Sequence, residues 1–73
     1  MTTDLDVRDL PPPEPMLRIL EAVTFLHPGE SLRVIHNRVP HPLYPRLRER
    51  GLLVETLEHG DNDEIHLVIH RPA

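Results

Sequence analysis

The 73-residue sequence predicts an α+β fold, a two-layer βαβαββ sandwich. Two observations predict it. Residues 5–8, 31–36, 52–57 and 64–70 have the alternating or short apolar pattern of strands. Residues 16–26 instead carry apolar side chains at every third or fourth position, the period of an amphipathic helix. We expect this helix and a shorter one on one face of a mixed four-stranded sheet ordered 1-2-4-3, with the other face open.

A cluster of prolines separates the first strand from the first helix. Leu5 and Val7 alternate with polar residues and are expected to face the core. Proline is tolerated in the first turn of a helix, where an N–H has no intrahelical partner, so residues 11–15 mark the start of the helix. The His-Pro-Gly sequence at 27–29 is expected to end it. The apolar stripe of this helix consists of Met16, Ile19, Leu20, Val23 and Leu26.

The second strand, residues 31–36, ends at His36, which lies on the same side as its apolar residues. The loop 37–40 follows, and a short second helix is predicted over residues 41–50, with proline in its first turn. The inward-facing residues of this strand and helix are Leu32, Val34, Leu43 and Leu47.

The last two strands are predicted to form a hairpin. Residues 52–57 are the third strand, residues 59–63 have the composition of a turn, and residues 64–70 return as the fourth strand. The fourth strand is expected to place Ile65, Leu67 and Ile69 inward and His66, Val68 and His70 outward.

The composition excludes several classes of protein. Without cysteine the chain has no disulfide, thiolate ligand, thiol nucleophile or persulfide. A formal charge of −4 and a pI of about 5.8 argue against binding nucleic acid. No apolar run of about 20 residues and no signal sequence is present, so we expect a cytoplasmic protein that does not associate with membranes. We expect one domain, residues 1–73, with a disordered end at 1–3, as a monomer or weak dimer.

A resemblance to a known family adds to this reading. The stretch Leu-Asp-Val-Arg-Asp-Leu-Pro-Pro-Pro-Glu-Pro-Met at 5–16 and the Pro-Gly-Glu-Ser-Leu at 28–32 resemble the opening of the TusA/SirA sulfur-carrier family. That family has a strand, a Cys-Pro-x-Pro sequence, a helix and a Pro-Gly-Glu before its second strand. Its cysteine carries a persulfide between proteins, whereas this chain has Pro12 at the matching position. The resemblance therefore implies the fold without the activity.

One segment departs from the sulfur carriers. Residues 36–44, His-Asn-Arg-Val-Pro-His-Pro-Leu-Tyr, resemble an uncharacterised bacterial branch of the same fold. Domains of that branch often occur beside or fused to hemerythrin-type diiron domains, which implies a possible connection to metal chemistry and no defined activity.

The candidate site lies at one edge of the predicted sheet. If strands one, two and three are parallel, they end at the edge where both helices begin, and ligands of such sheets favour that crevice. The groups expected there are the turn from Pro12 to Glu14, the loop from His36 to His41, Tyr44, and the final hairpin with His59 and Asp61. We predict a partner surface that comprises Pro12, Pro13, Glu14, Arg38 and Tyr44.

Two functions fit this edge, and neither is enzymatic. The lone serine, Ser31, has no partner in the sequence, and there is no glycine-rich phosphate loop. The first function is a non-catalytic interaction module that binds a protein partner. The alternative is an accessory protein of respiratory or nitrogen-oxide metabolism that binds iron, copper, zinc or haem through His36, His41 and His59. Each histidine also has a structural interpretation, which for His36 is a strand-end residue hydrogen-bonded to a loop or helix amide.

Overall fold

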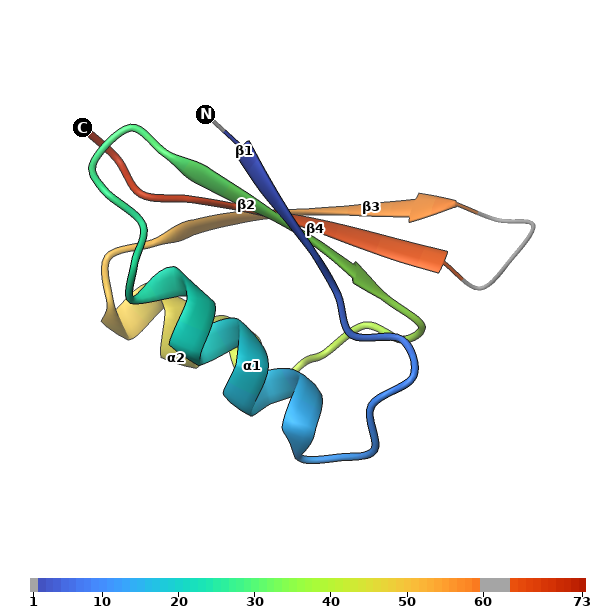
Figure 1. Ribbon diagram of the computed structural model, residues 1–73. Helices are drawn as coiled ribbons and strands as arrows, with labels where there is room; N and C mark the ends of the chain where they lie inside the picture. The colour runs from blue at the N-terminus through green and yellow to red at the C-terminus, as the bar shows by residue number, and fades with distance from the viewer. Residues whose placement is uncertain (1, 60–63) are drawn as a thin grey trace.

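The computed structural model describes residues 2–59 and 64–73, and it has the predicted element order. The elements are β1 (Thr2–Asp6), α1 (Glu14–Val23), β2 (Ser31–His36), α2 (Leu43–Glu49), β3 (Leu53–His59) and β4 (Glu64–His70) (Figure 1). They form a four-stranded sheet in the order β1-β2-β4-β3, as predicted. Strand β1 runs parallel to β2, and β4 runs antiparallel to both β2 and β3, so β1, β2 and β3 point the same way.

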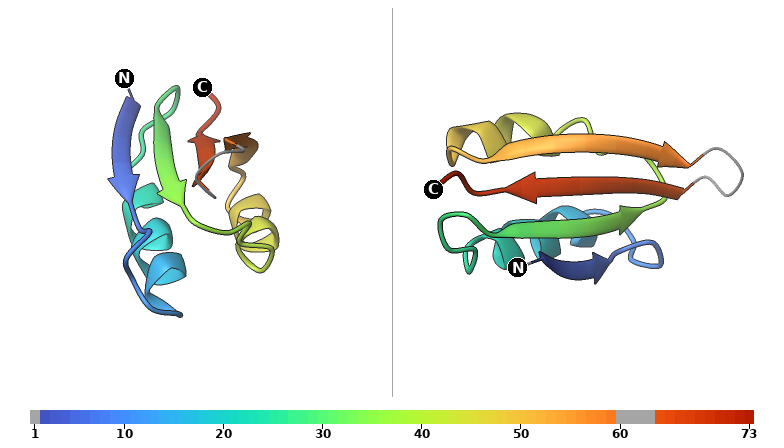
Figure 2. Two further views of the ribbon diagram at one scale, coloured as in Figure 1. Left: turned by 90° about the vertical axis from the view of Figure 1, so that its right-hand side faces the viewer. Right: turned by 90° about the horizontal axis from the view of Figure 1, so that it is seen from above.

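Both helices cover one face of the sheet, and the other face is open (Figure 2). The buried residues of the strands alternate with exposed or half-buried ones, as a sheet with one covered face requires. Neither of the helices described here is long and apolar enough to cross a membrane. The buried apolar core consists of Val7, Ile19, Val23, Leu26, Leu32, Val34, Leu43, Leu47, Leu52, Leu67 and Ile69.

Strands β2 and β4 have the bounds that the sequence predicts, whereas β1 and β3 differ. Thr2 and Thr3 pair with β2 and belong to β1, so the expected disordered end at 1–3 is wrong for these two residues. Met1 lies outside the described residues. β1 stops at Asp6 because the backbone N–H of Arg8 bonds to the Asp6 carboxylate, which turns the chain. β3 continues to His59 through its pairing with β4, and residues 60–63 of the expected turn are not described.

The first helix is shorter than predicted. α1 ends at Val23, and the amides of the next three residues bond to carbonyls three positions back, which tightens the chain into a turn. Leu26 follows this turn and is still buried. Further on, Gly29 adopts a φ of +88°, a left-handed conformation that glycine reaches without strain. The second helix, α2, covers residues 43–49 of the expected 41–50.

The chain after β4 is fastened to the turn before β2. The Gly29 amide donates to the Arg71 carbonyl over 2.7 Å, and the Arg71 amide donates to the Glu30 carbonyl over 3.0 Å. The Arg71 guanidinium also donates to the Val23 carbonyl over 3.2 Å. A cation at the C-terminal end of a helix is favoured by the helix dipole, so this contact caps α1.

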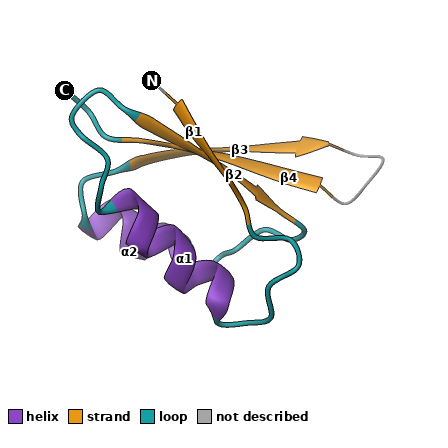
Figure 3. Cartoon of the chain, viewed as in Figure 1, coloured by secondary structure: helices purple, strands orange, loops and turns teal. Residues whose placement is uncertain are grey.

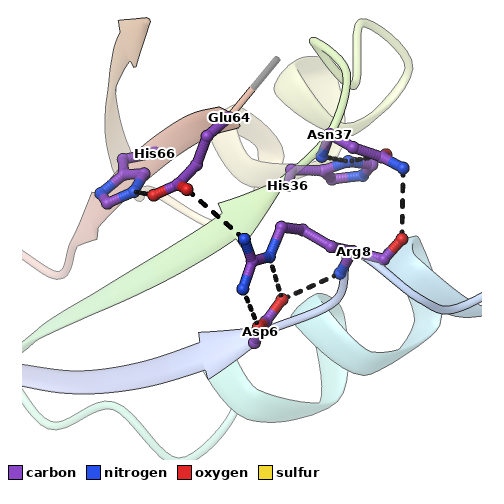
Figure 4. Close-up of polar contacts among 6 residues, drawn as sticks. All are labelled: Asp6, Arg8, His36, Asn37, Glu64 and His66. Atoms are coloured by element: carbon purple, nitrogen blue, oxygen red, sulfur yellow. Dashed lines mark hydrogen bonds and ion pairs between the residues drawn. The ribbon is translucent and has the colours of Figure 1, made fainter. Parts of the chain in front are cut away.

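A chain of charged contacts links β1 to β4 (Figure 4). The Arg8 guanidinium binds the Asp6 carboxylate over 2.8 Å and reaches Glu64 at 3.4 Å, and Glu64 in turn contacts His66. The hydrogen bonds from Arg8 lower the pKa of Asp6 to about 2. Asp6 therefore holds the turn that leaves β1.

Candidate functional site

Two loops lie side by side at the edge where β1 and β2 end and the helices begin (Figure 3). The first leads from β1 to α1 and the second from β2 to α2. The Asn37 side-chain amide donates to the Arg8 carbonyl over 3.2 Å, which ties the loops together (Figure 4). The predicted convergence of these loops is therefore present in the structure.

The two loops enclose an apolar hollow of about 240 Å³, here called the proline hollow. Five of its ten lining residues are prolines, because both helices start with this residue type at this edge. Proline also keeps its backbone in one region of φ, so the walls are stiff. The lining residues are Leu10, Pro12, Pro13, Pro15, Met16, His36, Asn37, Arg38, Pro40 and Pro42.

His36 is the buried polar residue of this site, with 4% of its surface exposed. Its Nδ1 atom accepts hydrogen bonds from the backbone amides of Asn37 at 2.9 Å and Arg38 at 3.3 Å. The structural interpretation of His36 as a strand-end residue bonded to loop amides is thus confirmed. The Asn37 Oδ1 atom lies 3.3 Å from the same Nδ1, but the two backbone N–H groups outnumber it and favour the neutral ring with its proton on Nε2.

Burial lowers the pKa of His36, and the nearby Arg38 charge lowers it further, against an opposing contribution from the Asn37 side chain. The neutral ring is therefore favoured. To bind a metal through Nε2, the ring would need its proton on Nδ1, where the two backbone N–H groups point. The two amide hydrogen bonds to Nδ1 thus disfavour a metal or haem bound through Nε2 of His36.

The other two histidines of the predicted metal site lie elsewhere. His41 is exposed before α2, and its ring makes a T-shaped contact with the Tyr44 ring, the centroids 6.3 Å apart. The backbone of His59 ends β3, which β4 separates from β2, and Asp61 lies outside the described residues. Among the residues that the structure describes, no three His, Cys, Asp or Glu side chains group so that they could hold a metal ion.

The structure brings together part of the predicted partner surface. Pro12, Pro13 and Arg38 line the proline hollow, but Glu14 and Tyr44 do not. Glu14 is exposed in the first turn of α1, where a carboxylate is favoured by the helix dipole. The Tyr44 hydroxyl lies 2.7 Å from the Thr56 hydroxyl and joins α2 to β3.

Several lining residues were not singled out by the sequence, although Asn37 and Pro40 lie within the loop from His36 to His41 that was expected at this edge. Met16 belongs to the apolar stripe of α1 and has the signature of a core residue, and Pro40 and Pro42 have the signature of a helix start. Asn37 follows His36 directly, and a polar residue after a strand end was the one signal that could have identified it.

The pKa of His36 predicts how stability depends on pH. Because folding lowers this pKa below 6.5, the unfolded chain binds more protons than the folded chain just below pH 6.5. The contribution of His36 to the free energy of unfolding is therefore complete above pH 6.5 and is lost as the pH falls toward the folded pKa. Urea denaturation between pH 8 and pH 5 measures this loss. A His36→Gln variant keeps an acceptor but does not titrate, so its free energy of unfolding should depend less on pH. If the variant and the parent show the same pH dependence, His36 is not its source.

The fold and the proline-rich edge define the class of protein. The architecture is that of the SirA-like proteins, and the crystal structure of a SirA-like protein from Desulfitobacterium hafniense superposes with a TM-score of 0.79. That superposition covers 100% of both chains at 20% sequence identity, so it establishes the fold. The chain belongs to the family described as "Uncharacterized conserved protein (DUF2249)", whose model matches residues 4–71. No curated protein is significantly similar in sequence.

Proposed function

We propose that this chain is a non-catalytic interaction module that binds a protein partner at the proline hollow. The observation that carries the proposal is the hollow itself, an apolar concavity with stiff walls on the surface of a small domain. Apolar surface exposed in a concavity gains free energy when an apolar group of a partner covers it. The hot spots of protein interfaces are pockets of this kind, filled by one anchoring side chain of the partner.

The chemistry of the edge supports binding over catalysis. In the sulfur carriers that the sequence resembles, a reactive cysteine stands where this chain has Pro12, and Pro12 is part of the hollow's wall. This chain thus has an apolar concavity at the place where the sulfur carriers have a reactive thiol. Ser31, the lone serine, lies at the other end of β2, and its hydroxyl bonds to His70 over 2.9 Å.

Site-specific photo-crosslinking in cells tests the proposal. A photoreactive residue in place of Arg38, which lines the hollow, should capture a defined protein partner. The matched control places the same residue at Arg46, which is also exposed but lies on α2 away from the hollow.

The expected result is a crosslinked species that forms from position 38 and not from position 46. The captured protein, once purified, should bind the unmodified chain in solution, and filling the hollow by Pro40→Trp should weaken that binding. Equal crosslinking from both positions, or none from position 38, would contradict a docking role for the hollow.

A further inference from the structure

We infer that the proline hollow receives the C-terminal residue of a partner protein, with an apolar side chain in the hollow and the terminal carboxylate at its rim. The inference rests on the proposed function and names the chemistry of the occupant. Two independent features support it, the size and apolarity of the hollow and the unused hydrogen-bond donors and charge around it.

The hollow has room for one large apolar side chain. A cavity of about 150 Å³ is sufficient to hold a benzene ring, and the hollow measures about 240 Å³. Its walls are prolines together with Leu10 and Met16, so the inserted group gains burial without needing a polar partner. A leucine or phenylalanine side chain meets these requirements.

Several polar groups around the hollow donate hydrogen bonds or carry positive charge, and the exposed Glu14 carboxylate in the first turn of α1 does not line it. The Nε2–H of His36 has no acceptor among the described residues, yet it is not one of the buried polar atoms without a partner, so it reaches the accessible surface. His36 is a lining residue of the proline hollow, so a donor on its ring lies at or near the wall of the hollow. Because two backbone amides donate to Nδ1, the tautomer in which Nε2 is a donor is favoured.

Arg38 and the start of α1 add to this donor set. The Arg38 guanidinium is exposed and makes no ion pair or hydrogen bond within the described part of the chain, while its backbone is held by His36. In the first turn of α1 the amides of Glu14 and Leu17 are bonded to carbonyls, and Pro15 has no amide hydrogen. The Met16 amide has no acceptor among residues 2–59 and 64–73. A helix of ten residues also presents the positive end of its dipole here.

These donors complement a carboxylate that lies next to an apolar group. In a C-terminal residue the carboxylate and the side chain are attached to the same carbon, so both can reach the hollow and its rim together. In an internal residue, the group attached to that carbon is a neutral amide carbonyl. An aspartate or glutamate side chain has a carboxylate but lacks the apolar group. The C-terminal residue is therefore the segment of a protein that matches both features.

An NMR titration of the ¹⁵N-labelled chain tests the inference. The probes are five-residue Gly/Ser peptides that end in leucine or phenylalanine, with either a free or an amidated C-terminus, and the free acids 4-methylpentanoate and 3-phenylpropanoate. Peptides with the free carboxylate should shift the Met16, Asn37 and Arg38 amide signals. Amidation should weaken binding about tenfold or more, since it removes a charge-assisted hydrogen bond.

Two variants separate the rim charge from general charge effects. Arg38→Gln should weaken binding of the free-carboxylate peptide about tenfold and leave the amidated peptide unaffected. Arg46→Gln removes an equal charge on α2 and should leave both affinities unchanged.

The inference is overturned if amidated and free peptides bind equally, if no peptide binds at millimolar concentration, or if the shifts lie on the open sheet face. It is also overturned if the free acids bind as tightly as the peptides, which would make the hollow a small-molecule site. A crosslink from position 38 without peptide binding would leave the docking role intact with a different occupant. Failure of both experiments would remove the docking role as well.

Discussion

Replacing Ile19 with alanine is expected to lower the free energy of unfolding by about 2–5 kcal/mol. Ile19 lies in the middle of α1 with 0% of its surface exposed, and it packs against the sheet as part of the core. Because the alanine side chain is smaller than that of isoleucine, the substitution leaves a cavity that the surrounding residues fill only in part. Domains of this kind have a total stability of about 5–15 kcal/mol, so the variant should be partly unfolded at low urea.

Leu17→Ala on the same helix is the matched control. Leu17 is 59% exposed, and its replacement should change stability by no more than about 0.5 kcal/mol. Urea denaturation followed by circular dichroism measures both variants, with the midpoint compared at a constant slope. Equal losses at the two positions would show that α1 does not dock through the face that carries Ile19.

Replacing Leu67 with alanine is expected to cost a similar amount, about 2–5 kcal/mol, because Leu67 is 0% exposed at the centre of β4. Its neighbour Val68 points to the open face of the sheet and is half-buried. Val68→Ala should cost only about 1 kcal/mol or less, since it removes little buried surface. The difference in stability loss between the two variants thus measures how much more deeply the helix-covered face of the sheet is buried than the open face.

The Val68→Ala result also tests the oligomeric state. If Val68→Ala costs as much as Leu67→Ala, something covers the open face in solution. Repeating the denaturation at two protein concentrations distinguishes a second copy of the chain, because a dimer becomes more stable as concentration rises. A concentration-independent result with a small Val68 effect is expected for the monomer.

The strands were predictable where sequence pattern and burial agree. β2 and β4 are short apolar-rich segments with polar residues at both borders, so their bounds follow from the sequence. Thr2 and Thr3 have no apolar pattern, and only their pairing with β2 makes them a strand. Leu26 extends the apolar stripe of α1 but lies beyond the helix, because a turn can bury a residue as well as a helix can.

The position of the site was predictable, but its shape was not. The parallel direction of β1, β2 and β3 brings the two loops to one edge, and this follows from the order of elements. The hollow depends on which side chains leave space between them, and the Asn37 contact with Arg8 that joins its walls is specific to the folded chain. The amide hydrogen bonds to Nδ1 of His36, which orient its ring, likewise have no counterpart in the sequence pattern.

The direction of the strands also decides how this chain can be attached to something else. β1 starts, and the chain leaves β4, at the end of the sheet opposite the two loops between strands and helices (Figure 1). Residues of those loops line the proline hollow. A linker at either end therefore emerges on the far side of a molecule whose long axis is 34 Å. Immobilisation on a sensor surface, or fusion to a second binding domain, leaves the hollow facing outward. Two such modules joined in tandem could engage two sites at once, with an effective concentration set by the linker.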